Sequence, residues 1–392
     1  MSSHVVIVTR LYSPARAAAA FRLQAVVREL RRSGQSVTVM SAHHDSRQRI
    51  TRVGVEGERI ISWPMLSGTG DGPRRMLSVL SFDVPLGFRL LLCILTLRPR
   101  VIIVEPPPTS GLICAALGRL TGTSVIYYAA DLWADMFTGA SSLRRGLRRV
   151  FHWVERTCIR SSTAVLTVNS ALAQRIASAS SVVPIVVGNG VDLRTYATRP
   201  APRSKALVYA GTLGVAQGAS ALVALGVMLR DLEPQARLDV YGEGAERASI
   251  ESLADRMGLR SVHFHGIVED CVVADALARA AAAVVVLKED DLYRAALPTK
   301  IYAALASGAP VLYVGPPGLA SDLIQDNDLG IAATRATLAT LAPWLRSRLD
   351  ASDHYRELEL RGWAALNGSL ETVARRVVAA CPGNRDDVLE VT

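Results

Sequence analysis

The chain has 392 residues, of which half are hydrophobic and 20% are charged, and its formal net charge is +9. The length predicts two domains, and the composition indicates a globular rather than a disordered chain. The net charge favours an anionic partner, namely a nucleotide, lipid phosphates or nucleic acid, and does not choose among them.

The first half of the chain alternates short apolar runs with helical patterns. Strands are predicted at HVVIVT, SVTVMS, RVIIVE, SVIYYAAD and TAVLTVN, and helices at AAAAFRLQAVVRELRRSG and SGLICAALGRLTG. Because parallel strands need a crossover connection, this alternation predicts a doubly wound parallel sheet. No leader pattern precedes HVVIVT and the five cysteines form no CxxC pair, so we expect a cytoplasmic protein without disulfides.

The longest apolar tract runs from Met76 to Leu97 and contains Asp83, Pro85 and Arg89. Each of these three residues is costly in a membrane-spanning helix. We therefore expect them to break the tract into segments that are too short to cross a bilayer, and no transmembrane segment is predicted.

The second half repeats the alternation with a different sequence. Its predicted strands are KALVYAG, ARLDVYG, SVHFHG, AAVVVL and PVLYVG, with helical patterns between them. The sequence therefore predicts an α/β fold of two Rossmann-like domains. The join is expected between Tyr196 and Lys205, which gives domains 1–198 and 199–350 and a final segment, 351–392, whose helix packs back on the first domain before a frayed tail.

Binding sites are expected in the strand-to-helix loops, which two facing domains would place around one cleft. In the second domain, GTLGVAQG contains Gly211, Gly214 and Gly218, and YGEGAER contains Gly242 and Gly244. Glycines let a phosphate approach the backbone at a helix N-terminus. Turns without a ligand are the alternative, because neither a Walker motif nor a full GxGxxG is present.

Lys300 is one of only three lysines in the chain and lies in the first turn of a predicted helix. Thr299 is the expected cap of this helix, and Pro298 stiffens its entry. A lysine in the first turn is unfavourable for the helix dipole by about 0.3–1 kcal/mol. A bound anion would reverse that sign, so we expect Lys300 to hold a diphosphate; a solvated lysine is the alternative.

The first domain offers basic and polar groups after two of its strands. TRLYSPARAAAAFR contains Arg10, Arg16 and Arg22, which either reach an anion or form a solvated basic face. YYAADLWAD places Asp131 and Trp133 just past another strand, where they can hydrogen-bond to and stack on a polyol. A buried tryptophan and a helix-capping aspartate are the alternative.

Four motifs of the second half resemble the donor domain of glycosyltransferase family 4, retaining GT-B enzymes that use nucleotide sugars: VYAGTLGVAQG, YGEGAERASIE, VHFHGIVED and LPTKIYAALASGAPVL. The first half resembles the acceptor domain and hinge of bacterial polysaccharide-type members at TRLYSPARAAAAFRLQAVVRELRRSGQSVTVM, EPPPTSGLICAAL, YYAADLW, VLTVNSALAQRI and VVGNGVDL. The resemblance runs from about His4 to about Gly330. It implies sugar transfer from a UDP- or GDP-sugar to a glycan, lipid-linked or small-molecule acceptor, with retention and without a metal or other cofactor.

The resemblance also implies the site residues, with Asp131 and Lys300 as catalytic. Donor-binding positions are expected at Gly211, Thr212, Leu213, Gly214, Gln217, Gly242, Gly244, Gly266, Ile267, Val268, Pro298, Thr299 and Lys300. Acceptor-binding positions are expected at Arg10, Tyr12, Arg16, Arg22 and Trp133. No metal site is expected, and the acidic run from Glu289 to Asp291 is interpreted as a solvated loop.

The sequence departs from the family pattern at several positions. Two glutamates that stand eight residues apart in the family are replaced here by Ala295 and Ala303, and a first-domain histidine by Ala130. The arginine and lysine that usually grip the pyrophosphate correspond to Thr212 and Gln217. These changes leave open a degenerate homologue acting as a partner or scaffold, and a sugar-nucleotide epimerase is a third reading.

A basic amphipathic helix is predicted from Ser141 to Arg160. It fits peripheral contact with an anionic membrane surface on the cytoplasmic side, where a lipid-linked acceptor would be found. A core helix with a solvated arginine face is the alternative. Nucleic-acid binding ranks low, because no recognisable module is present.

Overall fold

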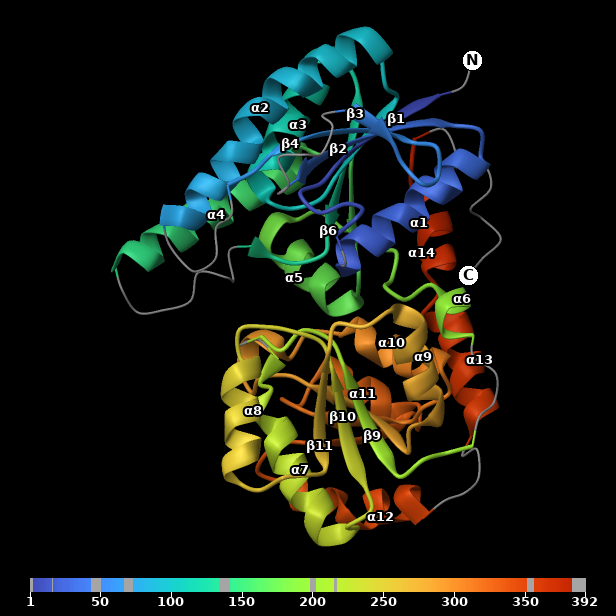
Figure 1. Cartoon of the computed structure of the whole chain (residues 1–392). Coiled ribbons are helices and arrows are strands. Elements are labelled where there is room, and N and C mark those ends of the chain that lie inside the picture. Colours follow the sequence, from blue (N-terminus) through green and yellow to red (C-terminus); the bar gives the residue numbers. More distant parts are fainter. Residues whose placement is uncertain are drawn as a thin grey trace. The chain divides into compact units, whose positions relative to one another are not determined.

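The computed structural model describes residues 3–15, 17–43, 51–66, 73–133, 142–197, 202–214, 217–350 and 356–382. The chain forms two compact units, each with covering helices and a sheet whose strands are mostly or all parallel (Figure 1). Unit 1 comprises residues 1–189 and 370–392, and unit 2 comprises residues 190–369. The division at Asn189 lies ahead of the join that the sequence indicated between Tyr196 and Lys205, because α6 (Leu193–Tyr196) packs on α9 and α10 of unit 2.

Unit 1 contains an eight-stranded sheet in the order β3-β4-β2-β1-β5-β6-β7-β8. All neighbouring pairs are parallel except β3 and β4, which are antiparallel. The strand order reverses between β1 and β5. The strands are β1 (His4–Val8), β2 (Ser36–His43), β3 (Thr51–Val53), β4 (Arg59–Pro64), β5 (Val101–Val104), β6 (Ser124–Ala129), β7 (Ala164–Thr167) and β8 (Ile185–Val186).

Helices cover both faces of this sheet because its strands are apolar on both sides. Val5 and Ile7 of β1 pack toward α1 (Ala18–Arg32) and α14 (Leu370–Ala379). Val6 and Val8 pack toward the opposite layer. That layer consists of α2 (Pro73–Leu97), α3 (Pro108–Thr121), α4 (Ser142–Ser161) and α5 (Ser170–Ser180) (Figure 1).

The tract that the sequence analysis expected to be broken is one continuous helix, α2, which passes through Pro85. The interpretation was wrong because the inner face of the helix packs on the sheet through Phe82, Leu86 and Leu90, all fully buried. Tertiary packing of this kind outweighs the cost of one proline. Residues Leu77–Leu97 are also long and apolar enough to cross a membrane by length and composition.

Unit 2 contains a six-stranded, all-parallel sheet in the order β11-β10-β9-β12-β13-β14, and its order reverses between β9 and β12. The strands are β9 (Ala206–Ala210), β10 (Arg237–Tyr241), β11 (Val262–Gly266), β12 (Ala282–Val286), β13 (Val311–Val314) and β14 (Gly330–Ala333). The longer helices are α7 (Ser220–Leu232), α8 (Arg247–Arg256), α9 (Asp270–Arg279), α10 (Thr299–Ala306), α11 (Leu319–Asp326), α12 (Ala342–Asp350) and α13 (Glu357–Asn367).

The final helical stretch is divided between the two units. α13 packs on α10 and belongs to unit 2, whereas α14 packs on α1 and belongs to unit 1. The apolar face of α14 explains this assignment, since Leu370, Val373 and Val377 complete the core next to α1. Of the stretch that was expected to pack back on the first domain, only α14 does so.

Candidate active site

The strand reversal in unit 2 brings two loops together at the C-terminal edge of its sheet. The loop after β9 begins at Gly211, and the connection after β12 leads to α10, whose first turn contains Lys300. Crevices at such reversals are the usual ligand sites of open α/β sheets, because neighbouring loops there diverge to opposite faces. The donor-site prediction therefore falls on the reversal point of unit 2.

Lys300 is held in place by two neutral side chains. Its Nζ donates hydrogen bonds to Tyr209 Oη at 2.8 Å and to Gln217 Oε1 at 2.7 Å. It also lies 4.4 Å from the centroid of the Tyr209 ring. Burial lowers the pKa of Lys300 to about 7. Within the described part of the chain, no carboxylate forms an ion pair with this ammonium group.

Gly211 lets the lysine approach the loop after β9. Its φ is +147°, a conformation that other residues rarely adopt, and a Cβ atom there would overlap Lys300 Cε. The Gly211 N–H donates to the carbonyl of Tyr241 at 2.9 Å, and the Gly242 N–H donates to the carbonyl of Gly266 at 2.7 Å. These two backbone hydrogen bonds link the ends of β9, β10 and β11 to one another next to Lys300.

The helix that contains Lys300 begins without a side-chain cap. Pro298 occupies the N-cap position and Thr299 is the first helical residue, so the expected capping by Thr299 is wrong. The rigid φ of proline suits the entry to the helix and excludes Thr299 from the cap. The first-turn N–H groups consequently add to the positive end of the α10 dipole beside the lysine.

The other predicted donor residues differ in exposure, since Leu213 is buried whereas Thr212 and Ile267 are exposed. Leu213 is fully buried and its N–H donates to the Glu243 carbonyl at 2.9 Å, so its side chain does not contact a ligand. The Thr212 carbonyl accepts a hydrogen bond from Tyr209 Oη at 2.7 Å. At Gly244 a Cβ atom would overlap the Leu213 carbonyl. Gly214 lies in the same loop, and Ile267 and Val268 follow β11 with the Ile267 side chain exposed.

Unit 1 has a charged pair at its own strand reversal. Arg22, only 4% exposed, donates from Nη2 to Glu105 Oε1 at 2.7 Å, and its guanidinium lies over the Tyr128 ring at 4.9 Å. Thr9 Oγ1 donates to Glu105 Oε2 at 3.2 Å. The charge of Arg22 is therefore neutralised inside unit 1, which corrects its assignment as an anion-binding group.

Two further acceptor-site predictions are already engaged by neighbouring groups. Tyr12 is buried and donates to Glu58 Oε1 at 2.8 Å, so its hydroxyl is not offered to a ligand. Arg10 donates from Nη2 to Ser78 Oγ at 2.9 Å and lies 5.8 Å from the Trp133 ring centroid. Arg16 lies outside the described residues.

Asp131 follows β6 and is exposed. Desolvation by the surrounding protein raises the pKa of Asp131, and this increase is opposed by Arg22 and reinforced by Glu105. The Trp133 side chain is partly exposed, and the backbone N–H of Trp133 donates to Glu155 Oε1 at 3.0 Å. Asp131 and Trp133 thus remain the accessible polar and aromatic groups at this edge of unit 1.

Two family models match the sequence, one for each half. Residues 17–190 match a glycosyl transferase 4-like domain, and residues 204–346 match glycosyl transferases group 1. No curated protein matches. The structure is similar to sucrose-phosphate synthase from Thermosynechococcus elongatus, with a TM-score of 0.76, 17% identity and coverage of 96% of this chain and 97% of that chain.

Two other solved structures agree with this likeness. WaaG, a glycosyltransferase involved in lipopolysaccharide biosynthesis, gives a TM-score of 0.70 at 17% identity, covering 97% of this chain and 100% of that chain. Anabaena HepE in complex with UDP gives 0.70 at 14% identity, covering 96% and 98%. The chain therefore has the GT-B fold, and its two halves match two glycosyltransferase domain models.

The acidic run from Glu289 to Asp291 forms local contacts. Glu289 accepts a hydrogen bond from the Arg335 N–H, and Asp291 pairs with Arg294 at 2.7 Å. Asp290 Oδ1 accepts from the Leu292 N–H at 3.1 Å. Among the described residues, no group of His, Cys, Asp or Glu has an arrangement suited to a metal ion.

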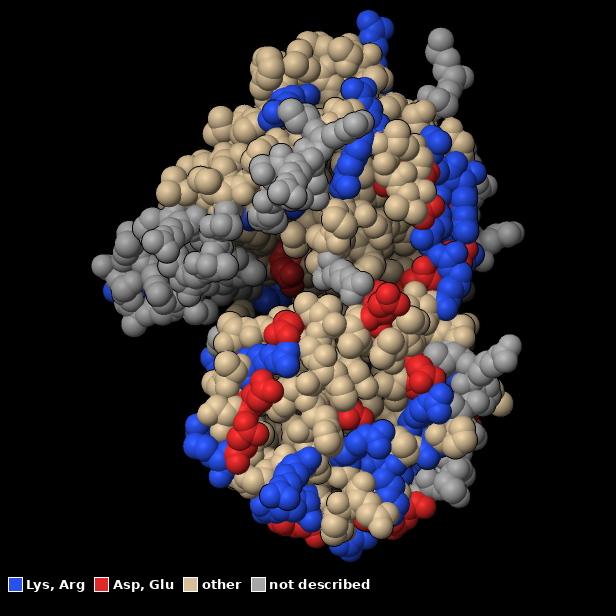
Figure 2. Space-filling model, viewed as in Figure 1, with Lys and Arg blue, Asp and Glu red and all other residues tan. Residues whose placement is uncertain are grey.

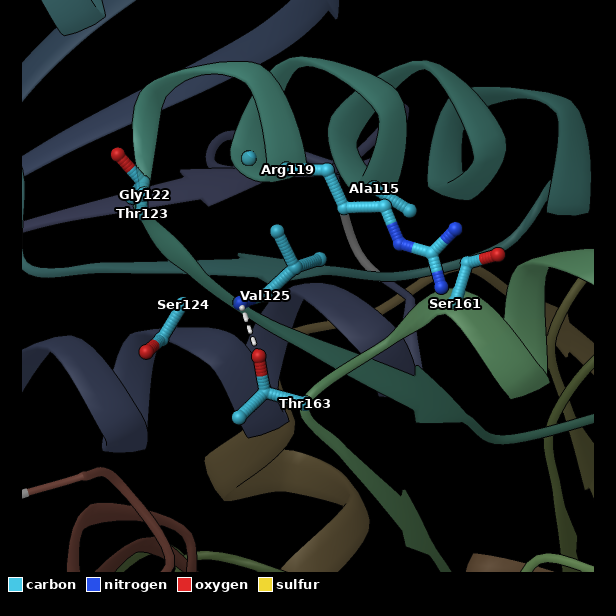
Figure 3. Close-up of a pocket in the computed structure, with 9 residues that line it drawn as sticks. Ala115, Arg119, Gly122, Thr123, Ser124, Val125, Ser161 and Thr163 are labelled. Atoms are coloured by element: carbon cyan, nitrogen blue, oxygen red, sulfur yellow. Dashed lines mark hydrogen bonds between the residues drawn. The ribbon is translucent and has the colours of Figure 1, made fainter.

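A small pocket of about 200 Å³ lies in unit 1 (Figure 3). It is lined by the end of α3 and by Ser124 and Thr163, which stand at the N-terminal ends of β6 and β7. The Val125 N–H donates to Thr163 Oγ1 at 3.1 Å across it. The pocket is therefore at the opposite edge of the sheet from Asp131, and it is not the candidate site.

Sequence reasoning missed one residue at the strand reversal of each unit. Tyr209 fixes Lys300, and Glu105 neutralises Arg22. Tyr209 stands two residues before Gly211, and Glu105 directly follows β5. Their positions at the C-terminal ends of predicted strands were the signal that could have identified them.

Proposed function

We propose that this chain transfers a sugar from a UDP- or GDP-sugar to a glycan, lipid-linked or small-molecule acceptor with retention of anomeric configuration, as in glycosyltransferase family 4. The observation that carries the proposal is the Lys300 ammonium, which is held at the reversal point of unit 2 by Tyr209 and Gln217. The solved structures of HepE with UDP and with UDP-glucose support a nucleotide-sugar donor. A cation beside a helix N-terminus suits a diphosphate.

The chemistry follows from where negative charge develops. As the bond between the anomeric carbon and the diphosphate oxygen breaks, charge grows on the leaving oxygen, and fixed positive groups stabilise it. Lys300 and the N-terminus of α10 supply that positive charge, while Tyr209 and Gln217 restrict the lysine to one geometry. We propose that no divalent ion takes part, because these groups fulfil its role.

The acceptor is assigned to unit 1. Asp131 is an exposed carboxylate that can accept a hydrogen bond from an acceptor hydroxyl, and the Trp133 ring can stack on a sugar. Arg10 lies near the Trp133 ring and adds a positive charge there. We assign the acceptor-site role to these three residues and not to Tyr12 or Arg22.

We propose that the enzyme works at the cytoplasmic face of a membrane, with α4 in peripheral contact with anionic lipid. The support is the outward face of α4, which exposes Arg145, Arg148 and Arg149 together with Val150 and Trp153. Basic and aromatic side chains on one helix face are typical of membrane-surface helices.

Calorimetry with UDP and GDP on the wild type and on Lys300→Met tests the donor site. We expect the variant to bind its nucleotide about 10- to 100-fold more weakly, because a charged hydrogen bond contributes about 1.5–3 kcal/mol. Lys205→Met is the matched control, since Lys205 precedes β9 and pairs with Glu233 at 2.8 Å. Its affinity should equal that of the wild type.

Equal nucleotide affinity in Lys300→Met and in the wild type would refute the role of the lysine. A wild type that binds neither nucleotide and transfers no sugar from a panel of UDP- and GDP-sugars would favour the partner or scaffold alternative. Conversion of a donor without an acceptor would favour the epimerase. Product analysis by mass spectrometry and NMR distinguishes these outcomes and gives the anomeric configuration.

A further inference from the structure

The outward face of α2 is apolar along nearly its whole length. Its exposed large side chains recur every three or four residues, so that they share one side of the helix. They are Leu77, Leu80, Val84, Phe88, Leu91, Leu92 and Leu95. At 1.5 Å per residue the stripe from Leu77 to Leu95 is about 27 Å long. We call these seven residues the α2 stripe.

The stripe contains no charged side chain. Between Leu77 and Leu97 the charged residues are Asp83 and Arg89, and neither belongs to it. Asp83 is buried and accepts a hydrogen bond from Ser110 of α3, while the Arg89 guanidinium lies over the Trp63 ring at 4.9 Å. The part of this surface that Figure 2 shows, at the upper left over α2, is largely tan.

A large exposed apolar patch on a protein surface indicates a site that contacts another apolar surface, either of a protein or of a membrane. Helix α4 indicates which kind of surface this is. It lies in the same helix layer as α2, since α3 packs against both helices. The exposed face of α4 presents five arginines, Arg145, Arg148, Arg149, Arg156 and Arg160. Within the described part of the chain, none of the five pairs with a carboxylate.

We propose that the α2 stripe lies in the interfacial layer of an anionic lipid bilayer, with the α4 arginines against the lipid phosphates. The apolar side chains of the stripe would contact the acyl chains, and the arginine guanidinium groups would form ion pairs with the anionic headgroups. A second copy of the chain fits less well, because pairing two such faces would bring ten arginines of one sign together. Full insertion is opposed by the inner face of α2, whose Phe82, Leu86 and Leu90 form the core of unit 1.

The inference deepens the membrane contact proposed for α4 by naming the surface that enters the lipid. It does not depend on the donor site, because α2 and α4 belong to unit 1 whereas Lys300 belongs to unit 2. Binding of UDP and binding of vesicles can therefore be measured separately on the same variants.

Co-sedimentation with vesicles of phosphatidylcholine containing about one-third phosphatidylglycerol tests the proposal. We expect the wild type to bind these vesicles and Val84→Glu/Phe88→Glu to bind at least about tenfold more weakly. These two residues are 72% and 68% exposed, so the fold tolerates the change. The matched control is Leu358→Glu/Leu366→Glu on α13, at residues 83% and 77% exposed, which should bind like the wild type.

A fluorescent label reports the depth of the contact. Cys271 is the exposed cysteine and the other four are buried, so a Cys271→Ser background leaves one reactive site when Val84→Cys or Leu358→Cys is added. An environment-sensitive label at position 84 should shift to shorter wavelength on addition of vesicles, and a label at position 358 should not. Because the vesicles contain no sugar-linked lipid, binding reports the bilayer and not an acceptor.

Two results would overturn the proposal. One is vesicle binding that is equal in the wild type and Val84→Glu/Phe88→Glu. The other is a dimer that this variant dissociates, with no vesicle binding by the wild type, which would assign the stripe to a second copy. In either case unchanged UDP affinity would leave the proposed donor site standing.

Discussion

The surroundings of Lys300 bring the pKa of its ammonium group close to neutral pH. Burial lowers its pKa to about 7, and both hydrogen-bond partners, Tyr209 and Gln217, are uncharged. A nearby diphosphate would favour the charged form and raise the pKa again. If Lys300 holds the donor as proposed, donor binding should therefore be accompanied by uptake of a proton.

We expect UDP affinity to fall as the pH rises above about 7, approaching a tenfold loss per unit, because the free lysine must be protonated before it holds the diphosphate. Calorimetry in two buffers of different ionisation enthalpy should show proton uptake on binding. Lys300→Arg, which stays charged, should remove both the pH dependence and the proton uptake. An affinity that does not change between about pH 7 and pH 9 would contradict this coupling.

The position of Lys300 at a helix start was readable from the sequence because strand, turn and helix are local signals. Its partners were not, since Tyr209 and Gln217 stand 91 and 83 residues away along the chain. Arg22 shows the opposite case. Its place near a strand-to-helix loop indicated an anion site, and the Glu105 that neutralises it lies 83 residues further on.

At the scale of elements, α2 shows why composition alone misjudged a segment. Asp83, Pro85 and Arg89 were interpreted as breaks, yet the helix is continuous and both charged residues have partners in the folded unit. Asp83 faces Ser110 on α3, and Arg89 lies against Trp63. The strands and most helices were predictable because their periodicity is local, whereas the tolerance of polar groups depends on contacts between elements.

Asp83→Asn should stabilise unit 1 at neutral pH by on the order of 1 kcal/mol, because it removes a buried charge and keeps an acceptor for Ser110. Burial raises the pKa of Asp83 in the folded state. Wild-type stability therefore falls as the pH rises through that folded pKa, and the loss is complete at neutral pH. The benefit of the variant should shrink in acid.

Urea unfolding of both proteins at about pH 7 and about pH 4 measures this difference. Asp231→Asn is the control, since the Asp231 side chain is 64% exposed and its replacement should have no such effect. A destabilised Asp83→Asn protein at neutral pH would show instead that the charge itself is needed for contact between α2 and α3.

At the scale of the molecule, each unit has its own cores. Unit 1 has one core on each face of its sheet, beside α1 and beside α2, and unit 2 has a similar pair. A ligand bound within unit 2 should therefore stabilise that unit directly.

We expect UDP at about 100 times its dissociation constant to slow exchange of the most protected amides in β9 and β12 about 100-fold, equivalent to about 2.7 kcal/mol. Amides of β1 and β5 in unit 1 should change far less. Hydrogen exchange with mass spectrometry resolves the two sets of peptides. Equal protection of both sets, or protection of unit 1 alone, would move the nucleotide site out of unit 2.

The return of α14 to unit 1 has a practical consequence for expressing the two units separately. Unit 2 is one continuous stretch, residues 190–369, and can be cut from the gene as a single fragment. A fragment ending at Asn189 would leave the apolar side of α1 bare, because Leu370, Val373 and Val377 normally shield it. Expressing the other half alone requires splicing its last helix back on through a short linker.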